Sequence, residues 1–495
     1  MAQILGICGW QALTRHCYNA QLFCVICGWI MIATSLDLKK DSIIKLFFYY
    51  FIPALCAMLA LSTYSTIDGI FVGQKIGTDG LAAIGACWAV FPACIAYELL
   101  FGFGGAAIVS YFLGSDRVAR ARLVFSSIFY FVAISSVAIG VLGFVLVDEI
   151  LGFLTRGKNI SSEIYALARI YLQITFLGMP FLILHPLSDI FVVNDKRPIL
   201  GMFAMILGSA SNIVLNYVFL FVLDMGIEGS ALATILAHFI GFSVLVSHFV
   251  RKRGALFFIP RFSFAAVISS AKSGLPESIS ELSAAIMMVL YNGALLSIAG
   301  SVGLAVYSVV LYCGIVFFTI LLSVSQALQP IASFNYGAGN FARLRYALGF
   351  ALVVVVVIGL LLYGVFYAFA PYFVGFFVDS SEEVAALSIR AMDIYYIGYV
   401  LLGVNMACAI FLQSIQRTIS SIIITICYTF LFIALLLPPL SESYGLDGAF
   451  ASYPVAQGCA LVVAMLVMGY ELGYGILSGN APSGRTLWKR RKHRV

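Results

Sequence analysis

Two stretches of the chain decide the fold because one repeats the other: residues 110–122 read SYFLGSDRVARAR, and residues 333–345 read SFNYGAGNFARLR. The serine, the first glycine and the Ala-Arg-x-Arg ending of both stretches share one register, with a shift of 223 residues. Further matches at shifts of 223, 220 and 219 residues are Pro53 with Pro276, Gly80-Leu81-Ala82 with Gly303-Leu304-Ala305, Gly178 with Gly398, Phe191 with Phe411, Arg197 with Arg417, Gly226 with Gly445 and Gly229 with Gly448. A nearly constant register through several loops indicates a duplicated chain.

The composition places both copies in a membrane. Of the 495 residues, 62% are hydrophobic and only 10% are charged, whereas soluble domains carry about 25% charged residues. So few charges cannot cover a surface in water, which excludes a soluble enzyme, a secreted disulfide scaffold and a nucleic-acid binder. The net charge of +6 comes from basic residues in short loops.

Apolar runs long enough to cross a bilayer, about 20 residues each, occur twelve times, six in each copy. They are apolar throughout, whereas barrel strands alternate apolar and polar residues. We therefore expect an all-α polytopic membrane protein of 12 transmembrane helices. The spans cover about 43–66, 81–112, 122–147, 163–193, 198–222, 229–250, 265–298, 302–334, 344–377, 384–413, 418–438 and 447–472.

The basic residues predict the orientation. On one set of span ends lie 22 of the 28 Lys and Arg residues, and four lie on the other. Because positive loops stay in the cytoplasm, we expect both ends of the 12-helix body to be cytoplasmic, in a bacterial inner (plasma) membrane. The expected parts are an N-terminal extension (1–42), an N-lobe (43–250), a cytoplasmic linker (251–264), a C-lobe (265–472) and a basic cytoplasmic tail (473–495). Met31 is an alternative natural start.

An even number of spans in each copy gives the two lobes the same topology, related by a pseudo-two-fold axis along the membrane normal. Two six-helix lobes with a substrate path between them are typical of transporters that work by alternating access. No Gly-Lys-Ser or Gly-Lys-Thr phosphate loop is present, so we expect an ion gradient to drive transport.

Motifs in both copies resemble the multidrug and toxic compound extrusion family, especially its bacterial drug-exporting branch. The resemblance covers roughly residues 43–470. Its motifs are Pro53 followed by Ile67-Asp68-Gly69, Gly80 to Gly85, Asn212 to Asn216, Gly226 to Thr234, Gly274-Leu275-Pro276 with Glu281 and Asn292, Gln329-Pro330 with Asn335-Tyr336-Gly337, and Phe411-Leu412-Gln413.

The resemblance implies a V-shaped pair of lobes that exports hydrophobic, often cationic, small organic compounds in exchange for Na⁺ or H⁺. It places an ion-coupling site in the N-lobe at Asp68, Tyr64, Asn212, Asn216 and Thr234. Asn216 departs from the family, which often has Asp there. Asp189 stands where an Asn is expected, and we include it in the ion-coupling site because it would restore the lost charge. Asp68 is also the residue expected to bind Na⁺, and no other cofactor is expected.

Other polar residues of the spans point to a substrate cleft. A charge in mid-membrane costs about 2.5–3.5 kcal/mol, and Glu281 lies inside its span, five residues after Pro276. We assign Glu281, Asn292, Gln329, Met287 and Met288 to the cleft. Plain packing also explains the methionines. His185, His238 and His248 could relay protons, but a lone His in a span is more often a hydrogen-bonded structural residue.

Three other functions stay open at this level. A lipid-linked precursor flippase of the same superfamily would have more spans and a cationic cavity. A major-facilitator transporter would carry a glycine pattern between its second and third helices that Gly114 to Arg120 matches only in part. A membrane enzyme lacks any catalytic motif here, so we expect no enzyme. We expect a monomer in contact with membrane lipids.

Overall fold

The computed structural model describes residues 36–156, 160–375, 377 and 382–476, all of them in helices or connecting loops. Within these residues nine helices are long and apolar enough to span a membrane, and one bent pair makes a tenth span. Two of the nine are hairpins of two passes each, because the backbone reverses at Gly300 and Gly445. The predicted twelve transmembrane passes are therefore confirmed. The predicted extension before residue 36 and the tail after residue 476 lie outside the described residues.

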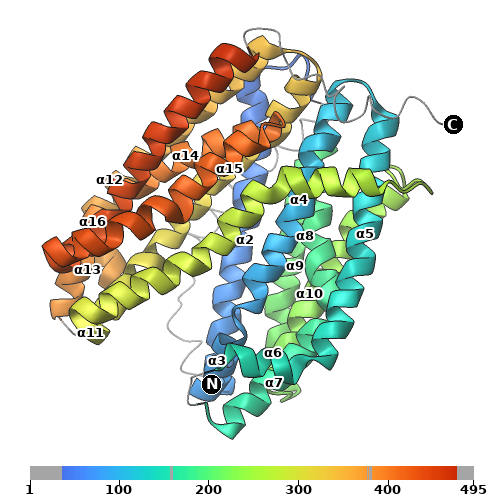
Figure 1. The fold of residues 1–495 in the computed structure, drawn as a ribbon. Coiled ribbons are helices and arrows are strands. Elements are labelled where there is room, and N and C mark those ends of the chain that lie inside the picture. Colours follow the sequence, from blue (N-terminus) through green and yellow to red (C-terminus); the bar gives the residue numbers. More distant parts are fainter. Residues whose placement is uncertain (1–35, 157–159, 376, 378–381, 477–495) are drawn as a thin grey trace, which may run out of the picture.

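The N-lobe forms the blue-to-green bundle of Figure 1. Its helices are α2 (Ile43–Lys75), α3 (Thr78–Cys87), α4 (Val90–Gly114), α5 (Val118–Val145), α6 (Val147–Leu154), α7 (Ser162–Leu177), α8 (Met179–Asn194), α9 (Pro198–Tyr217) with the π-helical turn η1 (Val218–Val222), and α10 (Ile227–Val250). The predicted fourth span is broken, because α7 and α8 meet at 53°. Pro180 lies in the first turn of α8, and its missing N–H removes a hydrogen bond that a straight helix would need.

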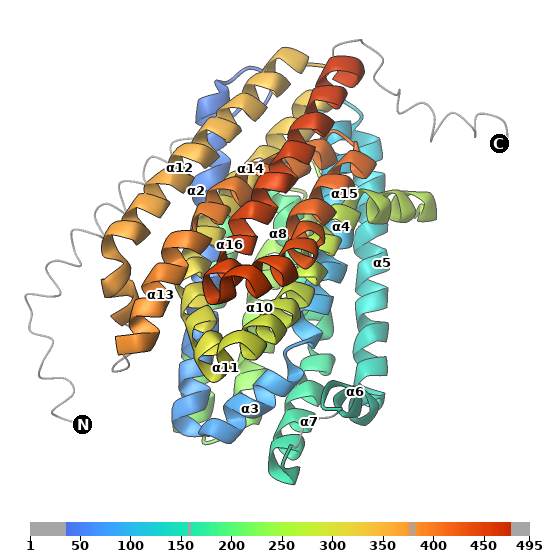
Figure 2. The same ribbon diagram turned by 60° about the vertical axis from the view of Figure 1, so that its left-hand side comes forward.

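The C-lobe forms the yellow-to-red bundle (Figures 1 and 2). Its helices are α11 (Phe264–Gly337), α12 (Phe341–Gly375), α13 (Glu382–Tyr395), α14 (Ile397–Ser414), α15 (Thr418–Ile426) with η2 (Cys427–Leu431), and α16 (Phe432–Tyr470) with η3 (Glu471–Ile476). The hairpin α11 supplies the seventh and eighth passes, and α15 to α16 supply the last two.

Backbone turns reproduce the sequence repeat. Gly300, at the tip of the α11 hairpin, has φ +58° and corresponds to Gly77, with φ +87°. Gly445, at the tip of the last hairpin, has φ +61° and corresponds to Gly226, with φ +63°. Left-handed φ values of this kind are easy only for glycine. The duplication therefore extends to the conformation of the turns, as the two lobes of one architecture require.

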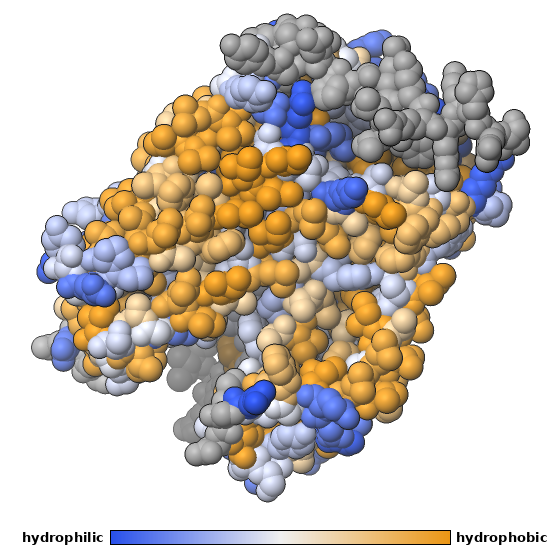
Figure 3. All heavy atoms as spheres, in the orientation of Figure 1, coloured by the Kyte–Doolittle hydropathy of each residue, from blue (hydrophilic) through white to orange (hydrophobic). Residues whose placement is uncertain are grey.

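The two lobes pack together at the end of the molecule that carries the basic loops. There α4 of the N-lobe runs against α11 so closely that a Cβ at Gly104 would lie 2.0 Å from the carbonyl oxygen of Ser270. Phe47 of α2 also contacts Phe350 of α12, with ring centroids 5.2 Å apart. Figure 2 shows α2 and α12 side by side. At the other end the lobes diverge, and the surface is hollowed between them (Figure 3).

Arg343, at the start of α12, ties the chain before α2 to the C-lobe. Its guanidinium donates hydrogen bonds to the carbonyl oxygens of Leu38 (3.3 Å), Lys40 (3.4 Å) and Asp41. The repeat places Arg343 opposite Arg120 of the N-lobe. One of the repeated basic residues thus contributes to the contact between lobes.

The linker that enters α11 lies against the N-lobe. Asp195 accepts hydrogen bonds from the Ala255 and Leu256 amides at 2.9 and 3.2 Å, and its other oxygen meets His248 at 2.7 Å. Ser126 and Ser127 of α5 accept hydrogen bonds from the Ile259 and Ser263 amides. We conclude that the linker is held along its length by one lobe.

Candidate functional site

A hydrogen-bonded group of polar side chains lies between α2, α9 and α10 in the N-lobe. Ser230 donates to Asp68 Oδ1 at 2.9 Å, and the Asn216 side chain also interacts with this carboxylate. Asn216 donates in turn to Asn212 Oδ1 at 3.0 Å, and Asn212 donates to Thr234 Oγ1 at 3.2 Å. The fold thus brings together four of the residues assigned from the sequence to ion coupling and adds Ser230.

The surroundings of Asp68 suit a small cation or a proton. Tyr64, one turn earlier on α2, and Tyr171 of α7 lie close enough to interact electrostatically with Asp68. Every described hydrogen-bond donor to the Asp68 carboxylate is neutral. Asn216 is fully buried, and its Oδ1 has no hydrogen-bond partner among the described residues. A buried oxygen without a partner costs about 1–3 kcal/mol, which a bound cation or a proton donor would remove.

The equivalent position of the C-lobe has no acid. Tyr291, the repeat counterpart of Asp68, lies fully buried and shares a hydrogen bond of 2.9 Å with Ser452 of α16. Its ring stacks on Tyr307 at 5.1 Å between centroids. Tyr395 stacks on Tyr453 beside this pair at 4.1 Å. Aromatic packing therefore fills the place that the polar group occupies in the N-lobe.

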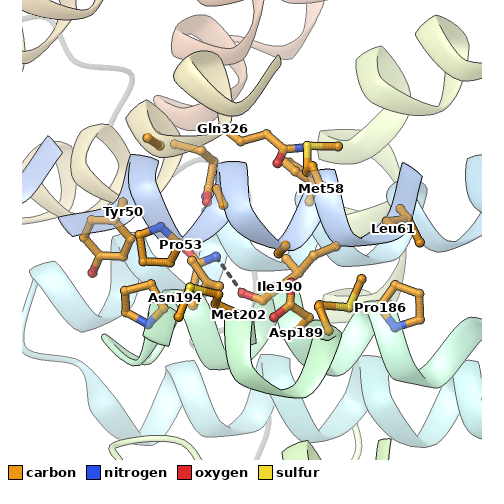
Figure 4. Close-up of a pocket in the computed structure, with 18 of the residues that line it drawn as sticks. Tyr50, Pro53, Met58, Leu61, Pro186, Asp189, Ile190, Asn194, Met202 and Gln326 are labelled. Carbon is orange, nitrogen blue, oxygen red and sulfur yellow. Dashed lines mark hydrogen bonds between the residues drawn. The ribbon is translucent and has the colours of Figure 1, made fainter. Parts of the chain in front are cut away.

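Asp189 lies apart from the Asp68 group. It lines a cavity of about 190 Å³ between α2, α4, α8, α9 and α11, together with Glu98 of α4. Figure 4 shows Asp189 among side chains from α2, α8 and α9, with Gln326 of α11 beyond them. A Cβ at Gly201 of α9 would lie 2.2 Å from Asp189 Oδ1. Glycine at 201 is therefore what allows the carboxylate to lie against α9.

Glu98 connects this cavity electrostatically with Glu281. It interacts with both Asp189 and Glu281, and Glu281 interacts with Glu277 one turn earlier on α11. Glu98 is 5% exposed. The sequence places Glu98 in the middle of an apolar span but cannot indicate its neighbours, because they come from helices far away in the chain.

The other residues assigned to the cleft are spread along α11. Gln329 lines the cavity and donates to Ser333 Oγ at 3.3 Å. Asn292 is partly exposed, Met287 packs against the core, and Met288 is exposed. The structure therefore places only Gln329 of this set in the cavity that holds Asp189.

Two features escaped the sequence analysis. Ser230 precedes Thr234 by four residues, which puts both on one helix face, and that spacing was a usable signal. The second feature is a pair of histidines: the sequence shows His185 and His238 as separate residues, but their Nδ1 atoms lie 3.2 Å apart between α8 and α10.

Among the described residues, no group of three His, Cys, Asp or Glu side chains could hold a metal ion.

Together, the twelve passes, the two repeated lobes and the carboxylate inside one lobe define a polytopic membrane protein of the duplicated six-plus-six class. The sequence profile of the MatE family matches residues 53–218 and 276–437. These are two separate segments, one in each lobe, and their starts differ by the repeat shift. The chain belongs to the MatE family, as its motifs predict.

Similar proteins agree with this assignment. The multidrug export protein MepA of Staphylococcus haemolyticus is 22% identical over 433 residues, which cover 87% of this chain and 94% of that protein. MepA of Staphylococcus aureus is also 22% identical, over 450 residues.

Solved structures match the fold. An outward-facing multidrug resistance MATE transporter has a TM-score of 0.82 at 24% identity, covering 88% of this chain and 96% of that one. A mutant of the Vibrio cholerae MATE transporter VcmN has a TM-score of 0.82 at 20% identity, covering 88% of this chain and 98% of that one.

Proposed function

We propose that this protein is a secondary active exporter of small organic compounds, many of them cationic, driven by inward movement of Na⁺ or H⁺ across a bacterial plasma membrane. Support comes from the MatE profile in both lobes and from relatives named as multidrug export proteins. We also propose a monomer, since one chain supplies both lobes, surrounded by lipid at its apolar faces.

The observation that carries the coupling proposal is the Asp68 group. A carboxylate inside the N-lobe, held by a hydroxyl and amides, can alternate between an ion-bound and an empty state. Thr234, Asn212 and the unpartnered Asn216 Oδ1 supply further oxygens for Na⁺, and the carboxylate alone suffices for a proton. Tyr291 offers no such group in the C-lobe, so we assign ion coupling to the N-lobe alone.

The packing of the lobes supports transport by alternating access. With the basic loops in the cytoplasm, the close contact between α4 and α11 closes the cytoplasmic side, and the hollow of Figure 3 opens outward. Export requires the opposite state as well. The backbone contact at Gly104 must then separate while the lobes rock.

The direct test is dye efflux from vesicles that contain purified protein, with Na⁺ and pH gradients imposed separately. We expect one gradient to drive efflux of a cationic dye by the natural protein, and Asp68→Asn to lose that dependence. Asp79→Asn, an exposed acid on α3, is the matched control. Full gradient-driven efflux by Asp68→Asn would remove Asp68 from the coupling site. Absence of any dye efflux by the natural protein under both gradients would overturn the exporter proposal.

A lipid-linked precursor flippase remains the second candidate. Its anionic substrate would need basic side chains along the path. The residues that line the described cavity include two acids and no Lys, Arg or His. This charge favours a cationic substrate.

A further inference from the structure

The cavity between α2, α4, α8, α9 and α11 contains two acids that the Asp68 group does not use. Glu98 is 5% exposed, and Asp189 Oδ1 is completely buried. Neither side chain has a hydrogen-bond partner among the described residues, although Asn194, on the same wall, donates to the Ile190 carbonyl (Figure 4). Buried carboxylates without partners or counter-ions are costly. A ligand that supplies hydrogen-bond donors and a positive charge would therefore stabilise these two acids.

The lining decides which cation fits. Most of it is apolar, including Pro53, Met58, Leu61 and Phe103. Among the described residues no group of three His, Cys, Asp or Glu side chains converges, so the cavity lacks the ligand cluster of a multi-acid metal site. An organic ammonium ion has an apolar body for this lining and N–H groups for the carboxylates. The volume of about 190 Å³ lies below the roughly 300–1,000 Å³ of drug-sized pockets, so only one end of a larger molecule fits.

We propose that this cavity is a subsite for the N–H-bearing ammonium group of an organic cation, with Asp189 and Glu98 as its hydrogen-bond acceptors. Glu281, which interacts electrostatically with Glu98, would attract the cation from the cleft. The identification of the ligand as an exported substrate rests on the proposed function, whereas the binding itself does not.

The subsite joins the two lobes. Glu98 and Asp189 belong to the N-lobe, whereas Gln326 and Gln329 reach the same cavity from α11 of the C-lobe. A cation bound here contacts elements that must separate when the lobes rock. The contacts of the bound cation therefore differ between the state in which α4 packs against α11 and the state in which these helices separate.

The test is calorimetric binding to full-length protein in lipid nanodiscs at about pH 7, where alkylamines are protonated. The probes are cyclohexylammonium, the neutral cyclohexanol and tetramethylammonium, which has a charge but no N–H. We expect binding of cyclohexylammonium and at least about tenfold weaker binding of the other two, since a charge-assisted hydrogen bond is lost in each case. Equal binding of cyclohexanol would overturn the proposal.

Two variants assign the binding to this cavity. Asp189→Asn and Glu98→Gln keep the side-chain shapes, and each should weaken cyclohexylammonium binding about tenfold or more. Glu149→Gln, an exposed acid on α6, should bind like the natural protein and corrects for partition of the amine into lipid. Unchanged binding in Asp189→Asn would refute the subsite. Normal binding without dye efflux by the natural protein would instead count against the proposed export function.

Discussion

Gly114 of α4 packs against the backbone of α11, and Gly337 of α11 packs against the backbone of α4, at the contact between the lobes. A Cβ at Gly114 would lie 2.0 Å from the carbonyl oxygen of Phe334, and a Cβ at Gly337 would lie 2.1 Å from that of Tyr111. The two glycines are repeat equivalents, and so are Tyr111 and Phe334. The contact is therefore symmetric, and the pseudo-two-fold axis passes between these helices.

This contact predicts that a side chain at either glycine prevents the lobes from closing. Gly114→Val and Gly337→Val should each abolish most transport, because the carbonyl oxygens opposite them cannot move aside as a side chain can. Distances between spin labels on the two lobes, measured near this contact, should increase. Gly364→Val on α12, where a Cβ meets nothing within 4 Å, should leave the distances and transport unchanged. Wild-type distances in Gly114→Val would contradict the prediction.

Ser230 offers a graded test of the Asp68 group. Ser230→Ala removes the hydroxyl that donates to Asp68 Oδ1 but keeps the carboxylate. The coupling-ion concentration for half-maximal transport should shift about two- to tenfold, as expected from one hydrogen bond. Ser243→Ala, on the same helix but partly exposed and hydrogen-bonded to the Phe239 carbonyl of that helix, should not shift it. No shift in Ser230→Ala would mean that Ser230 does not tune Asp68.

The asymmetry of the lobes predicts a different result at Tyr291. Tyr291→Phe removes only the hydroxyl that pairs with Ser452 and keeps the ring stacked on Tyr307. Ion-driven efflux should persist, in contrast to Asp68→Asn, because no coupling acid lies in the C-lobe position. We expect a loss of roughly 1 kcal/mol in unfolding free energy at most, measured by chemical denaturation. Loss of ion dependence in Tyr291→Phe would show that the C-lobe takes part in coupling.

The buried pair of Asp195 and His248 should be important for stability. Both side chains are almost completely buried, and Asp195 also holds two linker amides. Asp195→Ala should lower the unfolding free energy by about 3–5 kcal/mol, the usual cost of removing one partner of a buried pair, and should expose the linker to protease. Asp116→Ala breaks an exposed ion pair with Lys39 and should cost less than about 1 kcal/mol. Equal effects of the two substitutions would contradict the burial argument.

Asp148, outside the membrane-spanning segments, gives a pH prediction. Arg169 donates to both of its carboxylate oxygens, at 2.7 and 3.1 Å, and holds the Asp148 pKa below its ordinary value, mainly through hydrogen bonding. A lowered carboxyl pKa stabilises the fold above the unfolded-state pKa, and this stability is lost as pH falls through the folded-state pKa. The natural protein should thus lose more thermal stability than Asp148→Asn between those two pH values. The effect should be small because the pair is exposed. Identical pH profiles would contradict it.

The fold was predictable because the duplication preserves identical residues at a constant spacing, and these matches can be recognised even in a chain that is mostly apolar. Shared register identifies equivalent positions, and the left-handed turns at Gly77 and Gly300 fall at such positions. The bend between α7 and α8 was missed, although Pro180 was visible at the break. A long apolar run reads the same whether the helix is straight or bent, so composition alone gives no sign of an angle.

The site was predictable where spacing within one or two helices defines it. Asn212 and Asn216 lie four residues apart and do bond to each other. Asp189 could not be placed in this way. A helix that is apolar on all sides lacks a polar face that would indicate its rotation, so the sequence could not show that Asp189 faces Glu98 and Gly201 instead of Asp68. The pairing of His185 with His238 was hidden for the same reason.

The hydrogen bonds from Asp195, Ser126 and Ser127 to the linker determine what a reporter placed there can detect. These bonds continue as far as Ser263. The hinge between the N-lobe and the C-lobe therefore cannot lie in the linker and begins at the start of α11, at Phe264. A fluorophore or an epitope attached anywhere from Ala255 to Ser263 would move together with the N-lobe. Its distance to a second label would change during transport only if the second label lies beyond Phe264.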